Sequence, residues 1–152
     1  MSLPFYPRQQ TVTTILLIDD NAADLAMWSK ALQTCPAHYS VLTATSGEGA
    51  LDLLRHEQID CVLLDLDLPQ ISGFELLFQL VGDRKAPKTP VVVLTRLWNP
   101  TLHQLTLENG AQAHLVKNRT SAQDLDKAIE QALAAVSAGT MKNGERLFPP
   151  TG

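Results

Sequence analysis

Cysteine is scarce in this chain of 152 residues, which contains only Cys35 and Cys61. Cys61 lies within an apolar run, where a thiol behaves as a small hydrophobic group. Two cysteines of this kind do not indicate a disulfide framework, and they fit a reducing compartment best. We therefore expect a cytoplasmic protein.

Long apolar runs and blocks of positive charge are also missing. No stretch reaches the roughly 18 to 20 apolar residues needed to span a bilayer, and the N-terminus has no signal-type apolar segment. The formal net charge is −4 at pH 7, without a Lys/Arg-rich block to attract nucleic acid. These absences predict a soluble protein that has no membrane partner and does not bind DNA by itself.

Apolar residues, by contrast, make up 45% of the sequence, which suits a single domain with its own core. Residues 1–13 contain two prolines and little periodicity, and we expect them to form an extended arm. Residues 139–152 begin with a glycine, contain a Pro-Pro pair and lack periodicity, which is typical of a tail or linker. The folded domain is thus expected over residues 14–138.

Five short apolar runs predict strands, and helical patterns lie between them. The runs are Thr14–Ile18, Val41–Thr45, Asp60–Leu64, Pro90–Leu94 and Ala113–Val116. They lack polar–apolar alternation, as expected of parallel strands that are covered on both faces. The helical patterns begin after the capping residues Asn21, Ser46, Ser72, Asn99 and Ser121. This alternation predicts an α/β fold, a doubly wound five-stranded parallel sheet with five helices.

Reactive side chains follow four of the predicted strands. Asp19 and Asp20 follow the first, Asp65 the third, Thr95 the fourth and Lys117 the fifth. Because the carboxyl ends of parallel strands meet at one edge of a sheet, these groups are expected to share a cleft. Carboxylate oxygens in such a cleft favour Mg²⁺ or Mn²⁺ over zinc, and a hydroxyl and an ammonium group suit a phosphoryl group. Alone, Asp19-Asp20, Thr95 and Lys117 would each more often be an ordinary turn or strand end, whereas Asp65-Leu66-Asp67 would be a site about as often as not.

In these segments the chain resembles the receiver domain of two-component response regulators. The matching pieces are Leu17-Ile18-Asp19-Asp20-Asn21, Val62 to Pro69 with Gly73, Val93-Leu94-Thr95, and Gly110-Ala111 before His114-Leu115-Val116-Lys117. Any one piece is a weak signal, but their order and spacing together are strong. The resemblance implies the flavodoxin-like strand order 2-1-3-4-5.

The resemblance also implies a role for each acidic residue. Asp65 corresponds to the residue that accepts the phosphoryl group. Asp20 and Asp65 correspond to direct metal ligands, whereas Asp19 acts through water and Asp67 offers its backbone carbonyl. Lys117 would neutralise charge on the phosphoryl oxygens.

The switch of the family is implied at two further positions. Thr95 would hydrogen-bond a phosphoryl oxygen and move toward it, which leaves room for the side chain at position 114 to swing inward. This movement would change the surface of the fourth helix, fifth strand and fifth helix, which is also where a homodimer would form. The expected partners are a sensor histidine kinase or phosphotransfer domain and an output domain or effector. The chain would not be an enzyme beyond promoting its own aspartyl phosphorylation and dephosphorylation.

Three residues depart from the family pattern. His114 replaces the usual Tyr or Phe, so the inward swing is weaker or pH-sensitive, or the histidine has no role. Asn118 replaces the usual proline, and Arg96 replaces a small residue. We expect Arg96 and Asp67 at the rim of the phosphoryl pocket, with the guanidinium either paired to Asp67 or lying over the phosphoryl oxygens. Either placement would narrow the approach of water.

Two alternative functions compete with the receiver. Phosphatases of the haloacid-dehalogenase type also use Asp-x-Asp, then Thr or Ser, then Lys, but their Asp-x-Asp normally ends the first strand. A degenerate receiver that only binds partners is the other alternative, and Arg96, His114 and Asn118 keep it open.

Overall fold

The computed structural model describes residues 12–82 and 89–145, with side chains to residue 137. Five parallel strands form one sheet in the order β2-β1-β3-β4-β5, which confirms the predicted flavodoxin-like topology. The strands are β1 Thr14–Ile18, β2 Ser40–Ala44, β3 Cys61–Leu64, β4 Val91–Thr95 and β5 Ala113–Val116. Every predicted strand is present, with ends that differ by at most one residue from the predicted bounds.

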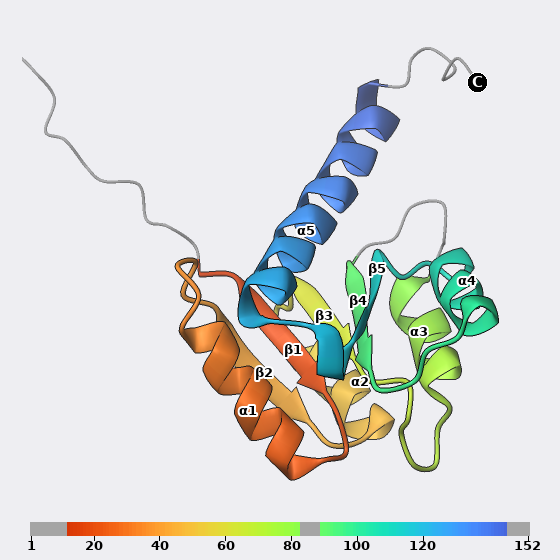
Figure 1. Cartoon of the computed structure of the whole chain (residues 1–152). Coiled ribbons are helices and arrows are strands. Elements are labelled where there is room, and N and C mark those ends of the chain that lie inside the picture. Colours follow the sequence, from red (N-terminus) through yellow and green to blue (C-terminus); the bar gives the residue numbers. More distant parts are fainter. Residues whose placement is uncertain (1–11, 83–88, 146–152) are drawn as a thin grey trace, which may run out of the picture.

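Helices connect successive strands and cover both faces of the sheet (Figure 1). They are α1 Ala22–Gln33, α2 Gly47–His56, α3 Gly73–Val81, α4 Pro100–Glu108 and α5 Ala122–Glu145, with a 3-10 turn at Lys117–Arg119. Asn21, Ser46, Ser72 and Asn99 cap the first four helices through their side-chain oxygens. Before α5, Ser121 and Asp124 exchange the two hydrogen bonds of a capping box.

Two hydrophobic cores, one on each face, explain why the strands lack alternation. Residues such as Leu17 and Leu63 point toward α1 and α5, where Trp28 and Ile129 are buried. Their neighbours along the strands point the other way, toward α2 and α3. Since both faces are covered, each central strand is apolar throughout.

Two local predictions need correction. The helical spacing of Phe78 predicts a core residue, but its side chain is exposed on α3. Helix α5 continues to Glu145, past Gly139, where the sequence pattern placed the start of a tail, and its C-terminal part extends away from the sheet (Figure 1). A single glycine costs a helix only about 1 kcal/mol and does not have to end it. Residues 1–11 of the predicted arm and residues 146–152 of the predicted tail lie outside the described residues.

Gly73 at the start of α3 positions the loop that follows β3. A Cβ atom at this position would lie 2.4 Å from the backbone oxygen of Leu66, so no larger residue fits without moving that backbone. The absence of a side chain at Gly73 therefore lets the backbone of Leu66, next to Asp65, pack against the first turn of α3.

Candidate phosphoryl and metal site

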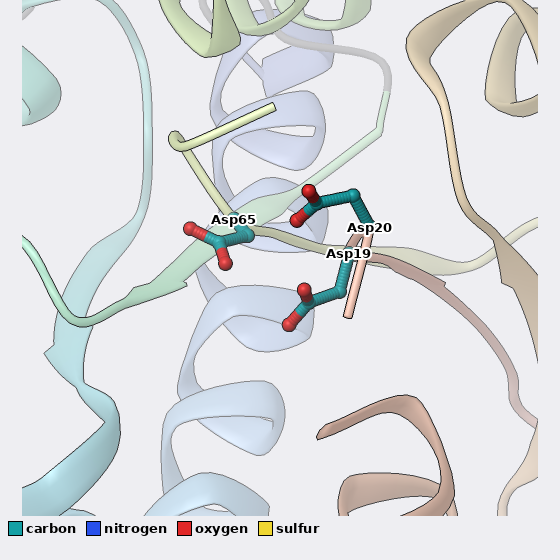
Figure 2. Close-up of side chains that lie close together, drawn as sticks. All are labelled: Asp19, Asp20 and Asp65. Carbon is teal, nitrogen blue, oxygen red and sulfur yellow. The ribbon is translucent and has the colours of Figure 1, made fainter. Parts of the chain in front are cut away.

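Three carboxylates converge at the carboxyl edge of the sheet, as predicted. Asp19 and Asp20 follow β1 and Asp65 follows β3, and the two strands are hydrogen-bonded neighbours. Their ligand oxygens all lie within 4.8 Å of one another, and Figure 2 shows the side chains pointing into a shared space. Asp19 and Asp65 are buried, whereas Asp20 is exposed. The cluster is therefore open to water on one side.

Lys117 lies at the centre of the buried part of this cluster. Its ammonium group donates hydrogen bonds to Asp65 Oδ2 at 2.7 Å, to Asp24 Oδ2 at 2.8 Å, and to Asp19 Oδ2. Only 4% of the lysine side chain is exposed. One buried cation thus contacts three carboxylates at once.

Thr95 completes the surroundings of Asp65. Its hydroxyl donates to Asp65 Oδ1 at 2.7 Å, and the backbone N–H of Asp67 donates to the same oxygen at 3.0 Å. The Thr95 oxygen also accepts a hydrogen bond from the backbone N–H of Leu97 at 3.3 Å. Asp65 is thereby linked to the loop that joins β4 to α4.

Asp24 is a site residue that the sequence patterns did not single out. It is the third residue of α1, with 6% of its surface exposed, and its backbone N–H donates to the capping oxygen of Asn21 at 3.0 Å. Its place in the first turn of a helix could have indicated a site residue, because a side chain there points back toward the strand that precedes the helix.

Arg96 pairs with Asp24. Its two terminal nitrogens donate to Asp24 Oδ2 and Oδ1 at 2.7 and 3.1 Å, which is a bidentate pair. The proposed pairing with Asp67 is therefore wrong for this structure, because both carboxylate oxygens of Asp24 face the guanidinium across the sheet edge. Asp67 itself is exposed.

Burial and charge act against each other in this network. Burial raises the pKa of Asp19, helped by the nearby negative charge of Asp65, although the hydrogen bond from Lys117 opposes the shift. Burial alone would lower the pKa of Lys117, but its hydrogen bonds to three carboxylates raise it above the ordinary value. The hydrogen bond from Arg96 is the main reason that the pKa of Asp24 is lowered. Asp24 and Lys117 therefore stay charged at neutral pH.

The donor set fits a small, hard divalent cation. Asp19, Asp20 and Asp65 offer only oxygen atoms, and the exposed side of Asp20 leaves room for the water ligands that Mg²⁺ retains. Across the described parts of the chain, no hydrogen bond from the protein reaches the Asp20 carboxylate, so its lone pairs are free for a metal. Asp19 is more engaged, since it also accepts from the backbone N–H of Asn21 at 2.9 Å.

His114 is buried at the end of the sheet and forms two hydrogen bonds. Its Nε2 donates to the backbone carbonyl of Leu97 at 3.1 Å, because a carbonyl oxygen can only accept. In neutral His114 the Nδ1 atom is then an acceptor, and His103 Nδ1 donates to it at 3.2 Å. The two rings stack with centroids 5.2 Å apart. His103 is therefore held by a hydrogen bond and a ring stack with His114, and is not freely solvated.

The His114 pair predicts a pH-dependent stability. Burial lowers the pKa of His114 below its ordinary value of 6.5, and the carbonyl of Leu97 opposes this while nearby His103 adds to it. As the pH falls through 6.5, the unfolded chain is protonated at this position before the folded chain is. Stability is thus fully present above pH 6.5 and declines below it, by at most about 1.4 kcal/mol per pH unit for one group.

Urea unfolding between pH 7.5 and 5.5 measures this decline. We expect His114→Gln to lose stability less steeply than the unmodified chain, because the amide does not titrate. The exposed His38 and His56 are common to both proteins and cancel in the comparison. If the free energy of unfolding fell equally steeply with pH in both proteins, His114 would not be the source of the pH dependence.

Comparison with known proteins agrees with this geometry. The family model for the response regulator receiver domain matches residues 15–130, so the chain belongs to this family, as the sequence motifs indicated. Receiver domains are generally signalling modules, and they bind Mg²⁺ at an acidic pocket of the kind formed here.

Relatives and solved structures place the chain among response regulators. The two-component response regulator ORR11 of Oryza sativa subsp. indica is 33% identical over 104 residues, which cover 68% of this chain and 69% of that protein. A probable cyclic di-GMP phosphodiesterase of Vibrio cholerae is 36% identical over 104 residues, but these cover only 23% of that protein. The structure of chemotaxis response regulator CheY4 of Vibrio cholerae has a TM-score of 0.69 and 29% identity, covering 80% of this chain and 99% of that one.

The position of the Asp-x-Asp motif argues against the phosphatase alternative. Asp65-Leu66-Asp67 follows β3, the third strand of the chain, whereas the phosphatase alternative places Asp-x-Asp after the first strand.

Within residues 12–82 and 89–145, no helix is both long and apolar enough to cross a membrane.

Proposed function

We propose that this receiver domain accepts a phosphoryl group on Asp65 from a sensor histidine kinase or phosphotransfer domain, in a Mg²⁺-dependent reaction. The observation that carries the proposal is the position of Asp65, which lies beside Asp19 and Asp20 and accepts hydrogen bonds from Lys117 and Thr95. This arrangement surrounds one nucleophile with a metal-binding cluster, a cation and a hydroxyl.

The proposed reaction is an in-line displacement at phosphorus. One carboxylate oxygen of Asp65 forms a bond to phosphorus while the bond to the donor breaks, and the electron pair leaves with the donor. Lys117 is already within hydrogen-bonding distance of Asp65 and can neutralise charge on the transferred group. Bound Mg²⁺, held by Asp20 and Asp65 with Asp19 behind water, would supply further positive charge. The chain would turn over no separate substrate.

The same contacts support a switch. A phosphoryl oxygen would compete with Asp65 Oδ1 for the Thr95 hydroxyl and draw Thr95, with the following loop, toward the site. His114 is tied to that loop through Leu97, so its hydrogen bonds would have to rearrange as well. Leu97 and Trp98 are exposed on this loop, and Leu105 and Leu107 on α4, which favours partner binding here.

The proposed partners follow from this surface. An output domain or an effector protein would read the switched loop and α4, and a homodimer would use α4, β5 and α5. The two free, buried cysteines support a reducing, cytoplasmic location.

Labelling with a small phosphoryl donor tests the proposal. Incubation with acetyl phosphate and MgCl₂ should add one acid-labile, hydroxylamine-sensitive phosphoryl group, detected by intact mass. Asp65→Asn should abolish the labelling and remain folded, because the change is nearly isosteric and relieves repulsion with Asp19. The exposed Asp52→Asn variant is a matched control that should label normally. Full labelling of Asp65→Asn would refute the assignment, and no labelling of the unmodified chain would favour a degenerate receiver.

A further inference from the structure

Arg96 and Asp24 come from opposite sides of Asp65. Arg96 is the first residue after β4, and Asp24 is in the first turn of the helix that follows β1. In the sheet, β3 lies between β1 and β4, and Asp65 is the first residue after β3. A pair that joins Arg96 to Asp24 therefore crosses the carboxyl end of the strand that carries the phosphoacceptor.

The arginine forms the outer layer of this crossing. The Arg96 side chain is 61% exposed, whereas those of Asp24 and Lys117 are 8% and 4% exposed. Asp24 Oδ2 accepts hydrogen bonds from both cations, at 2.7 Å from Arg96 and 2.8 Å from Lys117. Hydrogen bonds thus join the exposed Arg96 to the buried residues Asp24, Lys117 and Asp65 in succession.

We infer that the Arg96–Asp24 pair is a strap that restricts in-line access to the phosphoryl group on Asp65 and so sets the lifetime of the phosphorylated state. The inference rests on the proposed function. Hydrolysis requires water to attack phosphorus opposite the Asp65 oxygen; the P–O bond breaks, its electron pair returns to the carboxylate, and the water gives up a proton. A small phosphoryl donor needs the same line of approach, because its leaving group occupies the position of the water.

Restricted access and charge stabilisation by Arg96 predict opposite effects on the rates of hydrolysis and phosphorylation. If the strap restricts access, opening it accelerates both hydrolysis and phosphorylation by a small donor. If Arg96 instead stabilises transition-state charge, removing it slows both reactions. Lys117 already contacts Asp65, a bound metal would add further positive charge there, and the guanidinium is paired with Asp24. Access is therefore the larger effect.

The experiment compares Arg96→Ala, Asp24→Asn and the double variant of the full chain. Each protein is phosphorylated with phosphoramidate and MgCl₂, the donor is removed, and loss of the phosphoryl group is followed by intact mass. We expect each single variant to shorten the lifetime about fivefold and to accelerate phosphorylation by a similar factor. The double variant should behave like the single ones, because either change opens the same strap.

Three controls keep the outcomes separate. Arg119→Ala removes one exposed positive charge from the 3-10 turn after β5 and should leave both rates unchanged. Arg96→Lys keeps the charge without the bidentate geometry and should fall between Arg96→Ala and the unmodified chain. Labelling at Asp65 in all variants shows that the proposed function holds independently of the strap. Three outcomes would contradict the proposal that the Arg96–Asp24 pair restricts access. They are an unchanged or longer lifetime in Arg96→Ala, slower phosphorylation of that variant, and additive effects in the double variant.

Discussion

Replacement of Lys117 by methionine is expected to lower the free energy of unfolding by about 3 kcal/mol in Mg²⁺-free buffer, the lower end of the range for a broken buried ion pair. Methionine keeps the apolar stem of the lysine but removes the cation that Asp19, Asp24 and Asp65 share. Their mutual repulsion is then uncompensated, except where Arg96 still pairs with Asp24. We expect a loss at the lower end of that range because the Asp20 side of the cluster is open to water, which screens the repulsion between the carboxylates.

Magnesium should restore much of this loss. A divalent cation between Asp19, Asp20 and Asp65 would replace the positive charge that methionine lacks, so MgCl₂ should stabilise Lys117→Met more than the unmodified chain. Urea unfolding with and without MgCl₂ measures the difference. Lys30→Met is the matched control, because Lys30 is exposed on α1 and its loss should change neither quantity. A Lys117→Met protein as stable as the parent, or one that magnesium does not rescue, would contradict the electrostatic role.

The two aspartates after β1 are expected to contribute unequally to metal binding. Asp19→Asn should weaken Mg²⁺ binding about tenfold, as loss of a group that acts behind the metal's direct ligands does, and Asp20→Asn should weaken it more. Asp20 is exposed and accepts no hydrogen bond from the described residues, so all its lone pairs can face the metal. Asp19 is already held by Lys117 and by the backbone N–H of Asn21.

Isothermal titration calorimetry with MgCl₂ ranks the two variants directly, without requiring phosphorylation. Asp52→Asn on the exposed face of α2 removes a carboxylate remote from the cluster and should bind like the unmodified chain. Equal losses in Asp19→Asn and Asp20→Asn would mean that both carboxylates contact the metal alike, against the ranking that the family resemblance implies.

Much of the fold and of the candidate site can be predicted from the amino-acid sequence. The runs that end in Asp19, Asp65, Thr95 and Lys117 indicate a parallel sheet with one reactive edge, and the structure brings those side chains together. Local patterns suffice here because strand, cap and helix signals each involve residues close in the chain. The strand order is implied by the family resemblance, and it is confirmed.

Local patterns mislead where they are ambiguous. Phe78 shares the helical spacing of α3, but at the edge of an apolar stripe spacing does not distinguish a buried from an exposed side chain. Gly139 resembles a helix end, yet α5 continues because one glycine is tolerated in a helix.

The sequence by itself determined the alternating elements, the reactive strand ends and the family of this chain, since periodicity and capping are encoded within short segments. Only the tertiary structure decided the partners of the polar side chains. Arg96 and Asp24 are 72 residues apart in sequence, and Lys117 and Asp24 are 93 apart. Such pairs depend on which strands are neighbours and on the direction in which each side chain leaves its helix or loop. The Arg96–Asp24 pair and the contact of His114 with His103 and with Leu97 are therefore properties of the fold that no single segment encodes.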